Sequence, residues 1–164
     1  MNHLLISKAC ESNASSCTSF SDIGKEMSGK ILTRDRYLQM ENQYLEVVDN
    51  YLDKSGCEAK DFKIVGLEDN RGTVNEEGVF FSLENPKIKL CAGESVLKAE
   101  FFLLIRLSLR DLLWARFETE DGCYITFGHD MHMYIGFPDE MKIACADLSI
   151  GELCAVECED DPHG

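Results

Sequence analysis

The hydrophobic positions between Thr33 and Gly56 recur with the period of an α-helix. Three tyrosines and three leucines each recur every seven residues: Tyr37, Tyr44, Tyr51, Leu38, Leu45 and Leu52. Thr33 is suited to the N-cap, and Gly56 is suited to the position just past the last turn. This pattern predicts one amphipathic helix whose tyrosine-leucine stripe packs into the core.

A second helix, almost entirely apolar, is predicted from about Ser95, its expected N-cap, to about Leu109. Its charged exceptions, Lys98, Arg106 and Arg110, are spaced by multiples of four residues and therefore share one stripe. The segment is typical of a central buried helix. We interpret its basic residues as helix-surface charges, in preference to an anion-binding site.

Segments in which apolar and polar residues alternate, or in which short apolar runs lie between turn residues, predict β-strands. They lie at residues 62–67, 79–81, 88–90, 113–118 and 153–158. A short helix or a loop is expected just before the last of them.

The longest alternating segment, residues 123–137, is too long for one ordinary strand, so the chain should turn within it. Opposite residues of an antiparallel pair point to the same face, which excludes a two-residue turn at His129-Asp130. A three-residue loop from Gly128 to Asp130 keeps one face wholly apolar, with Asp130 in a position that is often left-handed. The predicted pairs are Phe127 with Met131, Ile125 with Met133, and Cys123 with Ile135.

Together these elements predict a single α+β domain, in which an antiparallel β-sheet packs against two main helices. Residues 1–30, rich in serine, are expected to form a loose N-terminal arm. The domain then occupies residues 31–158. An acidic tail, residues 159–164, follows, and the acidic residues from Glu157 onward are expected to be flexible and solvated.

Acidic residues are concentrated toward the C-terminus. The chain has 164 residues and a formal net charge of −14. Residues 1–116 contain 18 acidic and 15 basic residues, whereas residues 117–164 contain 12 acidic residues and one base, Lys142. Such a field repels nucleic acids and anionic membranes and attracts a basic partner. The alternative interpretation is an acidic surface that only keeps the protein soluble.

The 8 cysteines show no spacing typical of a metal site or of a disulfide framework. No two of them form a CxxC pair, and the closest two, Cys154 and Cys158, lack a matching second pair. The sequence also shows no secretory leader and no apolar run long enough to span a membrane. We therefore expect a cytoplasmic protein whose cysteines are mostly buried and reduced.

His129 and His132, on either side of Asp130, are the sharpest hint of chemistry. A zinc site needs three or four converging ligands, and only these two histidines are placed together. The chain contains no nucleophile elbow, no cysteine in an activating motif and no phosphate-binding glycine loop. We therefore expect no catalytic residue, no metal site and no cofactor. Two alternatives stay open: a metal-binding protein or metalloenzyme that uses the His129/His132 region, and a structural interaction domain of a larger assembly.

The segment from Phe101 to Phe137, about a quarter of the chain, resembles small immunity proteins of bacterial polymorphic-toxin and contact-dependent growth inhibition systems. In that family an apolar helix with an LxLR-type element runs into a tryptophan-bearing strand, and a hairpin ending in FG-x-D-x-x-MYI follows. The matching residues are Leu107, Leu109, Arg110, Trp114, Phe127, Gly128, Asp130, Met133, Tyr134 and Ile135. His129 and His132 stand where aromatic residues are expected. These motifs are mainly structural.

The resemblance implies a partner, the C-terminal domain of a cognate toxin, and many such domains are nucleases with basic clefts. An acidic protein imitates the phosphate field of a nucleic acid and associates rapidly with such a cleft. Exposed carboxylates beside aromatic anchors are the expected contact groups. The candidates are Glu118, Glu120, Asp121, Asp130 and Asp139, with Tyr124, His132 and Tyr134 on the polar face of the hairpin.

Overall fold

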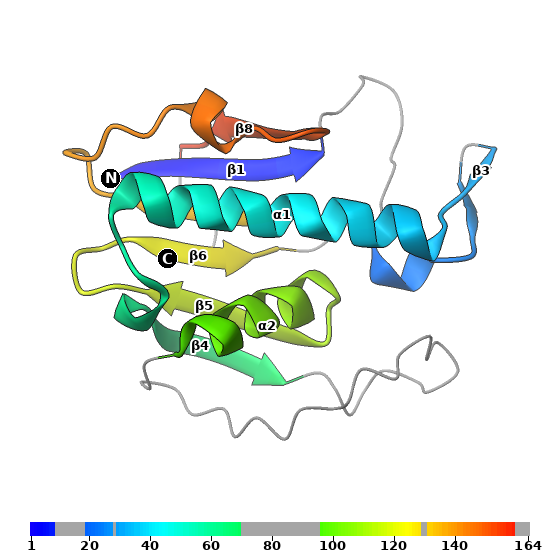
Figure 1. Cartoon of the computed structure of the whole chain (residues 1–164), viewed down its shortest axis with the longest axis horizontal. Coiled ribbons are helices and arrows are strands. Elements are labelled where there is room, and N and C mark those ends of the chain that lie inside the picture. The colour runs from blue at the N-terminus through cyan, green and yellow to red at the C-terminus, as the bar shows by residue number, and fades with distance from the viewer. Residues whose placement is uncertain (9–18, 28, 70–95, 129–130, 160–164) are drawn as a thin grey trace.

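Six strands form one antiparallel sheet, which the computed structural model shows behind two helices (Figure 1). The structure describes residues 1–8, 19–27, 29–69, 96–128 and 131–159. The strands are β1 (Asn2–Lys8), β4 (Lys63–Asp69), β5 (Leu113–Glu118), β6 (Tyr124–Phe127), β7 (Met133–Phe137) and β8 (Leu153–Glu157). They lie in the order β4-β5-β6-β7-β1-β8, and all neighbouring pairs are antiparallel.

Helices α1 (Arg34–Ser55) and α2 (Lys98–Leu109) both cover the same face of this sheet (Figure 1). The smaller elements are the 3-10 helices η1 (Phe20–Asp22), η2 (Ala59–Asp61) and η4 (Cys145–Leu148), and a hairpin of β2 (Glu26–Met27) and β3 (Lys30–Ile31). The predicted fold class, a single α+β domain with an antiparallel sheet against two main helices, is confirmed.

Strand β1 corrects the prediction that residues 1–30 form a loose N-terminal arm. It lies inside the sheet and pairs with β7 on one side and with β8 on the other. Leu4 and Ile6 are 2% and 0% exposed, because alternate residues of a strand face the same side and this side lies under the helices. The apolar run LLI was too short to signal a strand beside the serine-rich segment that follows.

Most of the other predicted strands are confirmed. β4, β5 and β8 match the segments predicted at 62–67, 113–118 and 153–158, and η4 is the short helix expected before the last strand. The strands predicted at 79–81 and 88–90 fall outside the described residues.

Helix α1 begins and ends where the sequence predicts. The Thr33 hydroxyl accepts a hydrogen bond from the Arg36 amide at 3.2 Å, which satisfies a backbone donor of the first turn. Gly56 ends the helix with a left-handed φ of 72°, a conformation that glycine adopts without strain.

The three heptad-spaced tyrosines of α1 are core residues, as predicted, and each also makes a specific polar contact. Their hydroxyls donate to backbone carbonyls: Tyr37 to Leu109 at 3.1 Å, Tyr44 to Met131, and Tyr51 to Gly136 at 2.7 Å. Burial is the main cause that raises the pKa of all three phenols, so they stay protonated and act as donors. The stripe therefore fixes α1 to the end of α2, to the β6–β7 turn and to β7.

The N-cap of helix α2 is Leu97, and not the predicted Ser95, which lies outside the described residues. The Leu97 amide donates to the carboxylate of Glu100 at 3.3 Å, so an acid in the first turn caps the helix without a capping hydroxyl. In the sequence, Glu100 was the residue that indicated where helix α2 begins, because it lies three residues after the N-cap.

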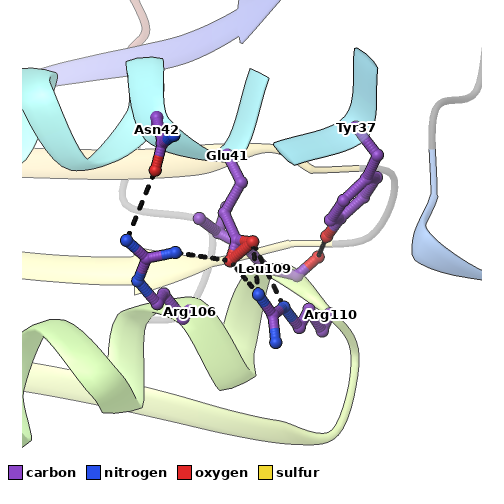
Figure 2. Close-up of polar contacts among 6 residues, drawn as sticks. All are labelled: Tyr37, Glu41, Asn42, Arg106, Leu109 and Arg110. Atoms are coloured by element: carbon purple, nitrogen blue, oxygen red, sulfur yellow. Dashed lines mark hydrogen bonds and ion pairs between the residues drawn. The ribbon is translucent and has the colours of Figure 1, made fainter. Parts of the chain in front are cut away.

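A buried ion pair joins the two helices and shows that the interpretation of the α2 basic residues as surface charges is wrong for Arg110 (Figure 2). Glu41 of α1 is 0% exposed, and Arg110, just past α2, is 4% exposed. Arg110 donates to the Glu41 carboxylate from Nη2 at 2.6 Å and from Nε at 3.2 Å. Arg106 reaches the same carboxylate at 3.5 Å and also donates to the side-chain oxygen of Asn42. The missed signal was an acid inside the apolar stripe of α1.

The face assignment of the β6–β7 hairpin is confirmed, but its predicted register is wrong by two residues. Ile125 pairs with Ile135 and Phe127 pairs with Met133, and all four side chains are buried beneath the helices. The Gly128 amide donates to the His132 carbonyl at 2.9 Å, so three residues separate this pair, as predicted, but the connection lies one residue later in the chain.

Parity alone could not fix this register, because a shift of two residues keeps every side chain on its face. The shift makes Met131 the residue just before the closing pair, and its side chain turns into the core, where it is 4% exposed with a left-handed φ of 59°. Asp130, the predicted left-handed residue, lies outside the described residues.

Gly136 is required because the ring of Tyr124, its partner in β6, covers it. A Cβ atom at position 136 would lie 1.9 Å from that ring. We expect Gly136→Ala to lower the free energy of unfolding by about 1–3 kcal/mol, measured by urea denaturation. In a Tyr124→Ala background, where the ring is absent, the same substitution should cost much less. Equal costs in the two backgrounds would contradict the steric explanation.

Candidate protein-binding site

Acidic residues from distant parts of the chain meet at one end of the sheet. The strand register places the end of β5, the β5–β6 turn, the end of β7 and the end of β8 side by side, next to the N-terminus. This is the left end of the sheet in Figure 1. Seven carboxylates lie on these segments, and we call them the acidic rim: Glu118, Glu120, Asp121, Asp139, Glu140, Glu157 and Glu159.

Three of the rim carboxylates form ion pairs: Glu118 with Arg116 at 2.6 Å, Glu120 with Lys63 at 2.6 Å, and Asp139 with the amino group of Met1 at 2.7 Å. The other four form no ion pair within the part of the chain that the structure describes. The side chains of Glu120 and Asp139 are 82% and 71% exposed. The rim therefore presents an excess of solvent-exposed negative charge.

The pairing of Lys63 with Glu120 gives the rim a measurable titration. The hydrogen bond from Lys63, together with its charge, holds the pKa of Glu120 below its ordinary value. A depressed carboxyl pKa favours the folded state above the unfolded-state pKa, and this contribution is lost as the pH falls through the folded-state value. In an NMR titration, Lys63→Met should raise the Glu120 midpoint. An unchanged midpoint would contradict the ion pair.

A group of packed side chains supports the rim on the sheet face opposite the helices. The guanidinium carbon of Arg116 lies 4.4 Å from the centre of the Tyr124 ring, a cation–π contact. The Tyr124 hydroxyl lies 2.8 Å from Nδ1 of His3. Arg116 is itself 9% exposed, so its ion pair holds the Glu118 carboxylate at the rim from a mostly buried position.

The structure brings together four of the eight predicted contact residues, and they are Glu118, Glu120, Asp121 and Asp139 of the rim. His132 and Tyr134 are partly exposed, and both lie farther along β7, toward the opposite end of the sheet. Asp130 lies outside the described residues.

The prediction that Tyr124 is an exposed aromatic contact is wrong. Tyr124 is 2% exposed, because Arg116 packs on its ring and His3 contacts its hydroxyl. The alternation of apolar and polar residues predicted a partly solvent-exposed outer face. It carries no information on the contacts by which long side chains of neighbouring strands cover one another.

Sequence reasoning missed Glu140, Glu157 and Glu159 as members of the rim. The prediction of a flexible, solvated tail from Glu157 onward is wrong at its start, because Glu157 is the last residue of β8 and pairs with Leu4. The Cys158 amide then donates to the carbonyl of His3 at 3.0 Å. Because β8 pairs with β1, the place of Glu157 and Glu159 in the rim depends on β1 lying inside the sheet. The sequence prediction lacked this strand at the N-terminus.

The hypothesis of a metal site at His129 and His132 needs at least one further ligand, and the described residues do not supply one. Nowhere in them do three His, Cys, Asp or Glu side chains gather in a way that could hold a metal ion. His132 is partly buried near the β6–β7 turn, and His129 lies outside the described residues.

Comparison with known proteins gives no match to a family model, to a curated protein or to a solved structure. No helix in the described part of the chain combines the length and the apolar character needed to cross a membrane.

Proposed function

We propose that this chain is a cytoplasmic immunity protein, which binds and neutralises a cognate toxin domain of a bacterial polymorphic-toxin or contact-dependent growth inhibition system. The observation that carries the proposal is the acidic rim, where carboxylates from four separate segments share one end of the sheet. In this proposal the chain acts by binding and not by catalysis.

The size of the rim suits a protein partner. Six strands at a spacing of about 4.8 Å make this end of the sheet about 24 Å wide. A standard interface uses roughly 800 Å² of each protein, which is a patch about 28 Å across. One end of the sheet with its flanking loops is therefore wide enough to serve as one interface.

The rim carboxylates are also held in place before any partner binds. The β5–β6 turn is closed by the Thr119 amide, which donates to the Cys123 carbonyl at 2.9 Å, and by the Cys123 amide, which donates to the Thr119 hydroxyl at 3.0 Å. Gly122 supplies the left-handed φ of 87° that this turn needs. Because the turn is already ordered, binding through Glu120 and Asp121 costs less backbone entropy.

The partner that this charge fits is a basic surface, such as the nucleic-acid cleft of a nuclease toxin. Carboxylates spread over a rigid end imitate the spaced phosphates that such a cleft binds. Opposite fields accelerate encounter, and the effect weakens as salt screens the charges. We expect the association rate constant to fall steeply between low and physiological salt.

Those residues carrying the resemblance to immunity proteins that the structure describes build the fold and lie apart from the rim. Five of them are 3% exposed or less: Leu107, Leu109, Phe127, Met133 and Ile135. Arg110 forms the buried ion pair, and the indole nitrogen of Trp114 donates to the carbonyl of Phe127 at 2.7 Å. A shared framework with a variable rim would let related proteins neutralise different toxins.

Co-expression tests the proposal. The chain should restore growth to cells that produce the toxin C-terminal domain encoded beside its gene, and the two proteins should purify as a complex. A toxin domain from an unrelated system is the matched control and should remain toxic. Growth arrest in the presence of folded chain, together with no complex, would overturn the proposal.

A further inference from the structure

Two carboxylates of the acidic rim are held by bases of this chain that differ in their exposure to solvent. Arg116 holds Glu118 at 2.6 Å, and Arg116 itself is mostly buried and packs on the Tyr124 ring. Lys63 holds Glu120 at the same distance of 2.6 Å, but the side chains of this pair are 41% and 82% exposed. Arg116 is therefore a fixed part of the sheet, whereas the Lys63–Glu120 pair lies at the surface that a partner would meet.

An exposed ion pair of this kind is easily replaced by a contact with another protein. In water the two opposite charges attract each other only weakly, because the solvent screens them and because fixing two long side chains costs entropy. An arginine of a docking protein binds a carboxylate through two parallel hydrogen bonds, and this attraction strengthens when the interface excludes water. Exchanging Lys63 for such an arginine is therefore favourable for Glu120.

The strand register provides a second carboxylate for the lysine that is released. Lys63, the first residue of β4, pairs with Glu118, the last residue of β5. Directly opposite residues of an antiparallel pair point to the same face, and lysine carries its charge on a flexible four-carbon stem. When the ammonium group leaves Glu120, it therefore still has the Glu118 carboxylate within reach.

We propose that Lys63 occupies, in the free protein, the place on Glu120 that a basic side chain of the toxin partner takes in the complex. Binding then exchanges an ion pair within this chain for an ion pair between two proteins. The inference rests on the proposed function and deepens it. It identifies Glu120 as a rim carboxylate that changes its partner on binding and Glu118 as one that keeps Arg116.

Lys63 therefore lowers the affinity of the rim for a basic partner. Its positive charge repels the incoming basic surface, and its contact with Glu120 has to break before the new contact forms. In Lys63→Met the aliphatic stem is retained, the competing charge is absent, and the local field is more negative. We expect this variant to bind the proposed toxin partner about 3- to 10-fold more tightly, with much of the gain in the association rate constant.

Two controls separate this local exchange from the change in net charge. Lys25→Met also removes an exposed lysine from an ion pair, with Asp22 at 3.1 Å, beside η1 and β2 and away from the rim (Figure 1). It should change the affinity by less than about 2-fold, because salt screens distant charges. In a Glu120→Gln background the carboxylate to be exchanged is absent, so Lys63→Met should lose most of its gain.

Surface plasmon resonance of the full chain and these variants against the toxin domain encoded beside its gene tests the exchange, and circular dichroism melting verifies that each variant is folded. The expected result is tighter binding by Lys63→Met, a gain that Lys25→Met lacks and that Glu120→Gln largely removes. If the native chain forms the complex, the inference alone is overturned when Lys63→Met binds no tighter than Lys25→Met, or when its gain is equally large in the Glu120→Gln background. If the native chain forms no complex, the inference and the proposed function are overturned together.

Discussion

Replacing Glu41 with alanine is expected to lower the free energy of unfolding by about 3–5 kcal/mol, because the substitution leaves the Arg110 guanidinium buried without its carboxylate. The pair lies between α1 and α2, with Glu41 0% and Arg110 4% exposed (Figure 2). Removing one partner keeps the full desolvation penalty of the other. Urea denaturation followed by circular dichroism measures the change.

Two controls separate the buried pair from ordinary surface charge. Arg106→Ala removes a side chain that is 35% exposed and 3.5 Å from the same carboxylate, so it should cost about 1 kcal/mol or less. The double variant Glu41→Leu/Arg110→Met removes both charges and should recover most of the stability lost in Glu41→Ala. A double variant no more stable than Glu41→Ala would contradict the explanation.

Reversing two rim charges, in Asp121→Lys/Glu140→Lys, is expected to weaken binding to the proposed toxin partner by about 10- to 100-fold, or roughly 1.4–2.8 kcal/mol. Both residues are exposed, and neither forms an ion pair with another described residue. The substitutions therefore change the field of the rim and leave its three ion pairs in place. Surface plasmon resonance at two salt concentrations measures both the affinity and the association rate constant.

The matched control is Glu26→Lys/Glu46→Lys, which changes the net charge by the same amount on β2 and on the exposed side of α1. If the rim is the docking surface, this variant should bind nearly as well as the native protein, apart from a small loss in long-range attraction. Equal losses in the two variants would show that only net charge matters and would contradict a localised site.

Local signals explain the parts of the fold that the sequence predicted well. The ends of α1 were predictable because Thr33 and Gly56 act on the backbone of their own helix turn. The core face of β6 and β7 was predictable because strand periodicity depends only on neighbouring residues. Such features need no knowledge of what the element packs against.

The errors come from interactions between segments far apart in the chain. Arg110 resembled a surface charge until α1 placed Glu41 against it, 69 residues away in sequence. The hairpin register depended on Met131 entering a core that the two helices complete. The β1 strand has a short apolar run, and its place in the sheet is determined by pairing with β7 and β8.

The candidate site was half predictable for the same reason. The charge count identified residues 117–164 as the acidic part of the chain, and Glu118, Glu120, Asp121 and Asp139 are in the rim. The count could not show that the end of β8 joins them, because that contact passes through β1. It also could not show that Tyr124 is covered by Arg116 and His3.

The most direct test of the central claim is hydrogen–deuterium exchange of the chain alone and in complex with the proposed partner, the toxin domain encoded beside its gene. The proposal predicts slower exchange in the complex at residues 118–122, 138–141 and 157–159, which carry the rim, with little change along the exposed side of α1. Protection confined to the helical layer, with the three rim segments unchanged, would contradict the acidic rim as the site of neutralisation.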